Sequence, residues 1–165
     1  MAIFDNLFNI SKDSGYAITG LNKELNSIYL YEYFVKNNRG ILVLCNSLYD
    51  ANDIYNRLIN YTDKVLFFPM DDFITTEVTD ISPEFMIDRL NTLNKTISGD
   101  KYIVVTNLMG VLRYLPEPKL YKDKIMEIVK NNDIDRDNFI SCLFDLGYEK
   151  VPVVSRTGEM AIRGY

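Results

Sequence analysis

Three short apolar runs limit what this chain can fold into. They cover residues 41–45, 65–68 and 102–106. Each has the length of a strand and lacks alternation, which is typical of a parallel strand covered on both faces. Segments with helical spacing of apolar residues separate the runs, and the connections are short. This order predicts an α/β fold, in which helices cover a parallel sheet with right-handed crossovers.

The expected helices of this sheet have recognisable starts. One runs from Asn22 to about Lys36, a second begins after a Ser47 cap, and a third begins with a Ser82 cap followed by Pro83. A short fourth helix is expected to be capped by Asn107, and residues 1–16 have a short amphipathic pattern of their own. The residues expected to face the core include Leu25, Ile28, Tyr31 and Val35 in the first helix and Met86, Leu90, Leu93 and Ile97 in the third.

Pro116 and Pro118 enforce an extended path. We therefore expect one domain over residues 1–115 and a small, truncated α+β domain over residues 116–165.

In the second domain, helices are expected at about 123–131 and from Asp135 to Leu146. A strand over residues 150–154, a turn at 156–158 and a second strand should follow. The end of the sequence cuts this last strand off, so the sequence looks like a fragment.

Composition excludes several classes of function. The net charge of −5 argues against a general nucleic-acid surface. No apolar run is long enough to cross a membrane and the N-terminus has no secretory signal, so a cytoplasmic protein is expected. The absence of histidine excludes His-based triads and His-ligated zinc. Cys45 and Cys142 lie in apolar contexts and are expected to be small core residues.

The segment before the first helix is where a phosphate loop would stand, after a short strand at residues 16–19. Gly15 and Gly20 have the interval of the two glycines in G-x-x-x-x-G-K-[ST]. Leu21 and Asn22, however, occupy the positions of the lysine that reaches the phosphates and the hydroxyl that holds magnesium. We therefore predict a degenerate phosphate loop, with no nucleotide, metal or other cofactor.

Two groups of carboxylates have simpler interpretations than metal binding. The group between residues 71 and 80 has no second chemical partner, so a solvated loop is expected. Alternating aspartates at 133–137 resemble a calcium loop, but Asn138 replaces its glycine and Phe144 its glutamate, so we expect helix capping by Asp135. The first group consists of Asp71, Asp72, Glu77 and Asp80.

Cations gather near the end of the sequence, on and between the two expected strands. Alternation along the second strand puts Met160 and Ile162 on one face and Arg163 on the other. If the first face is core, Arg163 points outward, where its planar guanidinium suits a carboxylate of a partner protein. A surface arginine that braces its own hairpin fits equally well. The three cations are Lys150, Arg156 and Arg163.

Short segments along the chain follow a known pattern in their order and intervals. Together they resemble the N-terminal UvrB-homology module of the bacterial transcription-repair coupling factor (Mfd). UvrB itself would keep an intact Gly-Lys-Thr loop near Gly20. The segments are residues 18–21, 41–43 with Ala51, 68–73, 82–84 with Arg89, Leu90 and Leu93, 112–116, 147–148 and 163–164.

This resemblance implies a RecA-like first domain, similar to domain 1a of UvrB, and the start of a UvrB-like second domain. It also implies a non-catalytic adaptor that binds the UvrA protein through the second domain and recruits nucleotide excision repair to stalled transcription. Arg163 matches the family's Arg-Gly position implicated in UvrA contact, and Lys150 falls where a basic residue often follows Gly-Tyr. Arg156 lies between them, whereas Met160 replaces a common aromatic residue.

The family's ATP-driven DNA translocase and RNA polymerase-binding domain are outside this sequence, so DNA, RNA polymerase and ATP are expected partners of the full-length protein only. Two other classes of function stay open. An active P-loop enzyme domain predicts a Mg-ATP site. A purely structural domain predicts no UvrA binding.

Overall fold

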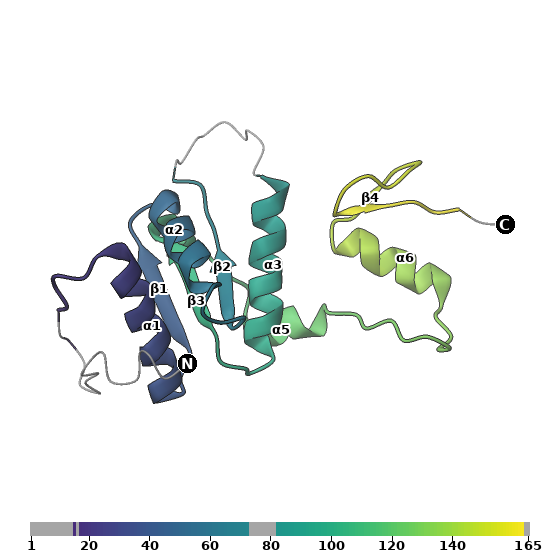
Figure 1. The fold of residues 1–165 in the computed structure, drawn as a ribbon. Helices are drawn as coiled ribbons and strands as arrows, with labels where there is room; N and C mark the ends of the chain where they lie inside the picture. Colours follow the sequence, from purple (N-terminus) through teal and green to yellow (C-terminus); the bar gives the residue numbers. More distant parts are fainter. Residues whose placement is uncertain (1–14, 16, 73–81, 164–165) are drawn as a thin grey trace. The chain divides into compact units, whose positions relative to one another are not determined.

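The computed structural model describes residues 15, 17–72 and 82–163. The chain divides into two compact units, one ending at Tyr114 and the other beginning at Leu115. The first contains a parallel sheet with helices packed on it, and the second contains helices and two short strands (Figure 1). The predicted α/β class with a small second region is confirmed, whereas the assignment of the units to UvrB-like domains stays a prediction.

The sheet of the first unit has three strands in the order β1-β3-β2. β1 (Ile41–Cys45) and β2 (Val65–Phe68) begin and end where their apolar runs predicted, and β3 (Ile103–Asn107) lies between them. Both pairs are parallel, with Ile103 of β3 opposite Ile41 on one side and Val65 on the other.

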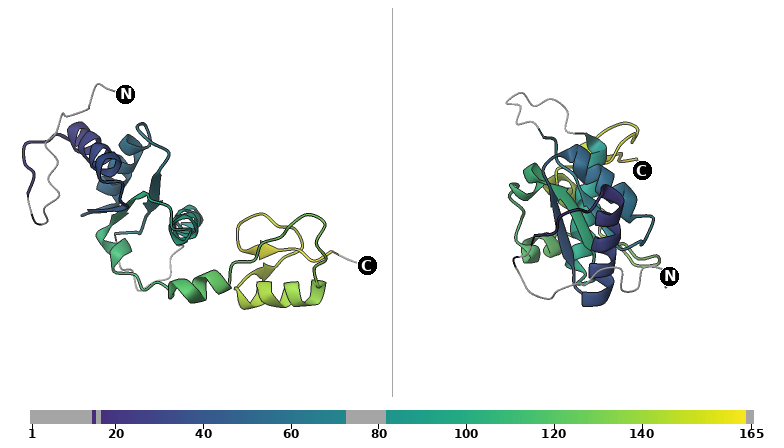
Figure 2. Two further views of the ribbon diagram at one scale, coloured as in Figure 1. Left: turned by 90° about the horizontal axis from the view of Figure 1, so that it is seen from below. Right: turned by 60° about the vertical axis from the view of Figure 1, so that its left-hand side comes forward.

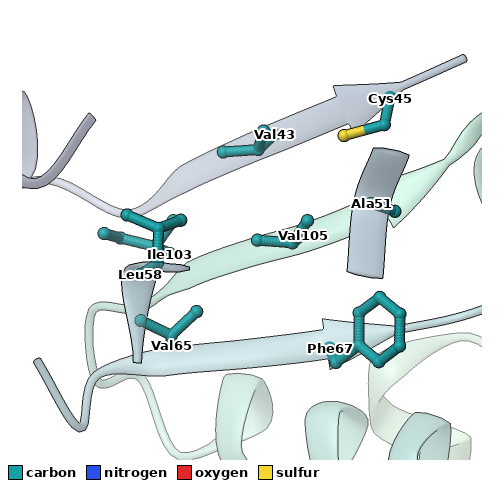
Figure 3. Close-up of a cluster of buried hydrophobic side chains, with 8 residues drawn as sticks. All are labelled: Val43, Cys45, Ala51, Leu58, Val65, Phe67, Ile103 and Val105. Atoms are coloured by element: carbon teal, nitrogen blue, oxygen red, sulfur yellow. The ribbon is translucent and has the colours of Figure 1, made fainter. Parts of the chain in front are cut away.

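One face of this sheet carries the core, and α1 (Lys23–Asn37) and α2 (Leu48–Leu58) lie on that side (Figure 1). Ala51 and Leu58 of α2 are fully buried against side chains from all three strands (Figure 3). Fully burying a leucine-sized side chain stabilises the fold by roughly 1.5–3 kcal/mol. The cluster consists of Val43, Cys45, Ala51, Leu58, Val65, Phe67, Ile103 and Val105.

The opposite face is covered only in part. α3 (Pro83–Ile97) packs on β2, where the Thr92 hydroxyl donates to the Phe67 carbonyl over 2.6 Å. On β1, Leu42 and Leu44 are 62% and 52% exposed. The expectation that the run at 41–45 is covered on both faces is therefore wrong, because α3 lies at the other edge of the sheet.

In two helices, the residues that face the core differ from those that the spacing of apolar residues predicted. Met86 and Leu90 of α3 are exposed, whereas Thr92 is buried. On α1, Ile28 is buried as expected, but Val35 is exposed. Because α3 covers only the β2 edge, part of its apolar side has no sheet beneath it.

Of the predicted caps, Ser47 and Asp135 are confirmed, whereas Ser82 makes no side-chain cap hydrogen bond at α3. The cap at Asn22 was not predicted. Asn22 and Ser47 accept hydrogen bonds from first-turn amides of α1 and α2. Asp135 accepts from the amides of Asp137 and Asn138, so it caps a helix, as predicted. The predicted cap at Asn107 is wrong, because its side chain makes no cap hydrogen bond to the short helix α4 (Leu108–Val111).

In the second unit, α6 (Arg136–Asp145) matches its prediction closely. The helix expected at 123–131 is wrong, because α5 occupies Pro118–Asp123 instead. Pro118 stands in the first turn, where a proline's fixed φ suits a helix start. Cys142 is exposed on α6 rather than buried, since no residue of that helix is buried.

The strands of the second unit, β4 (Glu149–Lys150) and β5 (Glu159–Met160), pair in parallel. The predicted hairpin is therefore wrong. Residues 151–158 loop back instead, and α6 lies alongside the pair (Figures 1 and 2). Met160, 7% exposed, is the one buried hydrophobic residue among the described residues of this unit. No helix in the described part of the chain is long and apolar enough to cross a membrane.

Candidate functional site

Both glycines of the phosphate-loop segment adopt positive φ values. Gly15 and Gly20 have φ values of +85° and +83°, a region that glycine adopts readily. The described residues 17–19 form no strand, contrary to the prediction, and Tyr16 lies outside the described residues. Asn22 accepts a hydrogen bond from the Leu25 amide over 2.8 Å, so its side chain serves as a cap of the chain itself.

The cation nearest to this loop is also engaged. Lys23 forms an ion pair with Asp53 of α2 at 2.9 Å, and this hydrogen bond raises the pKa of Lys23. Arg57 pairs with both Glu24, at 2.7 Å, and Asp53, at 3.0 Å. These contacts join the first turn of α1 to α2. Lys23 is the only cation between residues 17 and 24, and its ammonium group is paired with Asp53.

The carboxyl edge of the sheet, where open α/β sheets commonly bind ligands, holds a side chain of the chain itself. Both carboxylate oxygens of Asp72 accept from the Leu48 amide at 2.9 Å, at the first residue of α2. Asn107 donates to the same carboxylate over 2.8 Å and to the Met70 carbonyl over 2.6 Å. An internal anion therefore occupies this helix N-terminus.

The described residues at this edge of the sheet form no cluster of metal ligands. Asp72 is exposed, as the solvated-loop prediction expected, but its contacts were not foreseen; Glu77 and Asp80 lie outside the described residues. In the described part of the chain, no three potential metal ligands come together. The nearby recess of about 400 Å³ is mostly apolar and is lined by Leu48, Tyr49, Asn52, Phe67, Asp72 and Phe85.

The three cations of the second unit have different surroundings. Arg156 contacts two glutamates of its own unit, Glu159 at 3.0 Å and Glu149 at 3.6 Å. Lys150 and Arg163 are exposed, and neither forms a hydrogen bond or ion pair with any described residue. Arg156, rather than Arg163, is therefore the arginine that braces its own unit through ion pairs.

Glu159 organises the loop between β4 and β5, and sequence reasoning missed it. One carboxylate oxygen accepts from the Ser155 amide at 2.8 Å, the Ser155 hydroxyl at 3.0 Å and the Arg156 amide at 3.1 Å. The other accepts from Arg156 Nε at 3.0 Å. These bonds, the Ser155 amide first, lower the pKa of Glu159. A glutamate four residues after a serine, across a glycine turn, was the available signal.

No protein-family model matches the chain. The chain is 31% identical over 163 residues to the transcription-repair-coupling factor of Staphylococcus epidermidis, and the match covers 98% of the chain but 14% of that relative. The factors of Staphylococcus haemolyticus and Staphylococcus aureus are 29% and 28% identical over the same shares. These matches confirm the resemblance found in the sequence. The chain belongs to the transcription-repair-coupling factor family, and it spans 14% of the length of these relatives.

Proposed function

We propose that this chain is a non-catalytic adaptor that binds the UvrA protein through its second unit. In the longer family protein, this contact brings nucleotide excision repair to stalled transcription. The observation that carries the proposal is the exposed guanidinium of Arg163, which has no partner among the described residues, in a unit where Arg156 is already paired. The proposal is also supported by the resemblance, which implies that Arg163 matches the family's UvrA-contact arginine.

An arginine of this kind suits protein recognition. Its planar fork pairs bidentately with carboxylates, and it retains its charge in a desolvated interface. Truncating one partner of a buried interfacial charge pair costs about 2–5 kcal/mol, whereas loss of a rim charge mainly slows association. Lys150, exposed and also without an ion pair to any described residue, adds a second point charge to the same unit.

The non-catalytic part of the proposal rests on the phosphate-loop segment. Leu21 replaces the phosphate-binding lysine, Asn22 caps its own helix, and Lys23 is paired with Asp53. We infer from the resemblance that ATP binding and DNA translocation belong to other parts of the longer family protein.

The proposal is tested by titrating UvrA with the 165-residue chain and its Arg163→Glu variant. Arg136→Glu is the matched control, because Arg136 is exposed, lies in the same unit and undergoes the same change of charge. At the first position of α6, a glutamate also suits the helix dipole. We expect Arg163→Glu to weaken binding by at least about thirtyfold, the equivalent of roughly 2 kcal/mol, and Arg136→Glu to change it little.

Binding by the unaltered chain should also weaken with salt, because exposed charges are screened over roughly 8–10 Å. Absence of UvrA binding by the unaltered chain would favour a purely structural domain. Unchanged affinity in Arg163→Glu, at an unchanged melting temperature, would place the binding surface elsewhere. A large drop in melting temperature would instead give Arg163 a structural role.

A further inference from the structure

We infer that the exposed pair Val153-Val154 is the apolar part of this binding surface, and that Glu159 holds it in position. The inference rests on the proposed function, because it extends the same surface. The partner chemistry that fits is an apolar recess bordered by carboxylates on a protein.

Met160 is not available for contact with a partner. Alternation put it on the face expected to be core, and it is 7% exposed and forms the core of its unit. Protein interfaces concentrate apolar contact at their centre and polar groups at the rim, so two cations alone make an incomplete surface. Val153 and Val154 are 65% and 51% exposed.

The parallel pairing of β4 and β5 brings these valines and Arg163 to one end of the small sheet. Lys150 is opposite Met160, and the Val151 amide donates to the Met160 carbonyl over 2.8 Å, which extends the ladder past β4. The strands run in the same direction, so residues 151–154 and 161–163 leave the sheet at the same end. An antiparallel hairpin would have sent them to opposite ends.

Glu159 gives the loop its shape. Its carboxylate binds the backbone amides of both Ser155 and Arg156, directly after Val154, so the return of the chain is fixed by a side chain from β5. A loop ordered before binding loses less conformational entropy in the complex. Glu159 is therefore a positioning residue, and its carboxylate does not need to touch the partner.

Charge around the valines favours an acidic partner surface. Glu149 and Glu159 are both paired with Arg156, at 3.6 and 3.0 Å. Lys150 and Arg163 keep their charges free of described partners. Two cations without a described partner and two exposed valines therefore belong to the segments at this end of the small sheet.

The first test is the double variant Val153→Ser/Val154→Ser, with Val129→Ser as the control because Val129 is 49% exposed in the same unit. Burial of the two valines predicts about tenfold to a hundredfold weaker UvrA binding for the double variant and little change for the control. The double variant should keep the salt dependence of the unaltered chain, whereas Arg163→Glu should reduce it.

The second test is Glu159→Gln, which keeps the length of the side chain but removes the charge. We expect faster hydrogen exchange at the Ser155 and Arg156 amides, unchanged exchange in α6 and weaker UvrA binding. Combined with the double valine variant, Glu159→Gln should add little further loss, because the two changes act on the same contact. Faster exchange in α6 as well would mean that Glu159→Gln unfolds the unit, which would contradict a role of Glu159 limited to positioning the loop.

The outcomes separate this inference from the proposed function. A chain that binds UvrA, is weakened by Arg163→Glu and is unaffected by Val153→Ser/Val154→Ser overturns the inference and leaves the proposed function standing. If the losses of UvrA-binding free energy from the valine changes and from Glu159→Gln add fully in the combined variant, Glu159 does not position the valines. No UvrA binding by the unaltered chain overturns both.

Discussion

The side-chain amide of Asn107 donates to the Asp72 carboxylate over 2.8 Å. The same carboxylate accepts from the Leu48 amide, so it links the end of β3 to the first residue of α2. Asn107 is fully buried. Close packing continues at Gly110, where an added Cβ would lie 2.2 Å from Thr106 Oγ1. The carboxyl edge of the sheet is therefore a structural joint.

Removal of this joint should destabilise the sheet unit. We expect Asn107→Ala to lower the free energy of unfolding by about 2 kcal/mol, because it leaves the Met70 carbonyl without its donor and opens a space. Asp72→Ala should cost about 1 kcal/mol, similar to the loss of a helix cap. Urea unfolding measures both, and Asp63→Ala is the control because Asp63 is exposed and has no described hydrogen bond. Equal effects of Asp72→Ala and Asp63→Ala would contradict the assignment.

The two units should differ strongly in stability. The first contains nearly all of the buried hydrophobic residues, whereas Met160 is the only one described in the second. Slow amide exchange is therefore expected in β1 and β3 and fast exchange after Leu120, and limited proteolysis should leave a core that ends near Pro116. Met160→Ala should melt the second unit selectively, because losing a buried methionine typically costs about 2–5 kcal/mol. Equal protection in both units would refute this prediction.

Much of the sheet unit followed from local signals. Unbroken apolar runs gave β1 and β2 their bounds, and Asn22 and Ser47 gave the helix starts, because both signals act within a few residues. The exposure of Leu42 and Leu44 did not follow, because it depends on which edge α3 covers. The order of the strands and the position of α3 depend on tertiary packing, which the periodicity of apolar residues in the sequence does not predict.

The candidate surface was only partly predictable. Sequence alternation identified Arg163 as a cation beside an apolar face, but it could not show that Arg156 is the arginine that braces the loop. The parallel pairing of β4 and β5 was missed because a glycine turn between two short strands resembles a hairpin. Glu159 organises that turn from four residues away. Its one sequence signal, a serine four residues earlier across a glycine turn, does not distinguish it from an ordinary surface glutamate.

The two cysteines should differ in reactivity. Burial raises the pKa of Cys45 to about 11, with a smaller contribution from Asp50, whereas Cys142 is exposed. Because the thiolate is the reacting species, a thiol reagent at pH 8 should label one cysteine per native chain and both after denaturation. Cys142→Ser should abolish the native labelling. Rapid labelling of Cys45 in that variant, under conditions where the sheet unit is folded, would disprove the assignment.

The charged cluster between α1 and α2 should make the first unit sensitive to acid. Hydrogen bonds from Tyr61 and then Arg57 lower the pKa of Glu24 below its ordinary value of 4.5, and bonds from Lys23 and then Arg57 lower that of Asp53 below 3.8. A carboxyl group with a lowered pKa stabilises the fold above its ordinary value and loses this contribution as the pH falls through the folded value.

Stability of the first unit should therefore decrease as the pH falls below about 4.5. Arg57→Met should flatten this dependence, and so should high salt, because the groups are exposed. Arg39→Met is the control, since Arg39 is exposed and has no described ion pair. Urea midpoints measured from pH 7 to pH 3 give the slopes, and identical slopes for the two variants would argue against a role for the cluster.

The last prediction concerns nucleotide. Calorimetry of the 165-residue chain with Mg-ATP should show no binding at micromolar concentrations, because Leu21 and Asn22 replace the residues that hold phosphate and magnesium. The double variant Leu21→Lys/Asn22→Thr should not restore binding. A working loop needs a strand before it and free amides at the helix start, but residues 17–19 form no strand and the Leu25 amide is already bound by the cap. A threonine at position 22 would keep that cap.

Binding of Mg-ATP by the double variant alone would show that the side chains at positions 21 and 22 are the whole reason why the unaltered chain does not bind it. A micromolar site in the unaltered chain, lost when Gly20 is changed, would instead support the P-loop enzyme and overturn the adaptor's non-catalytic character.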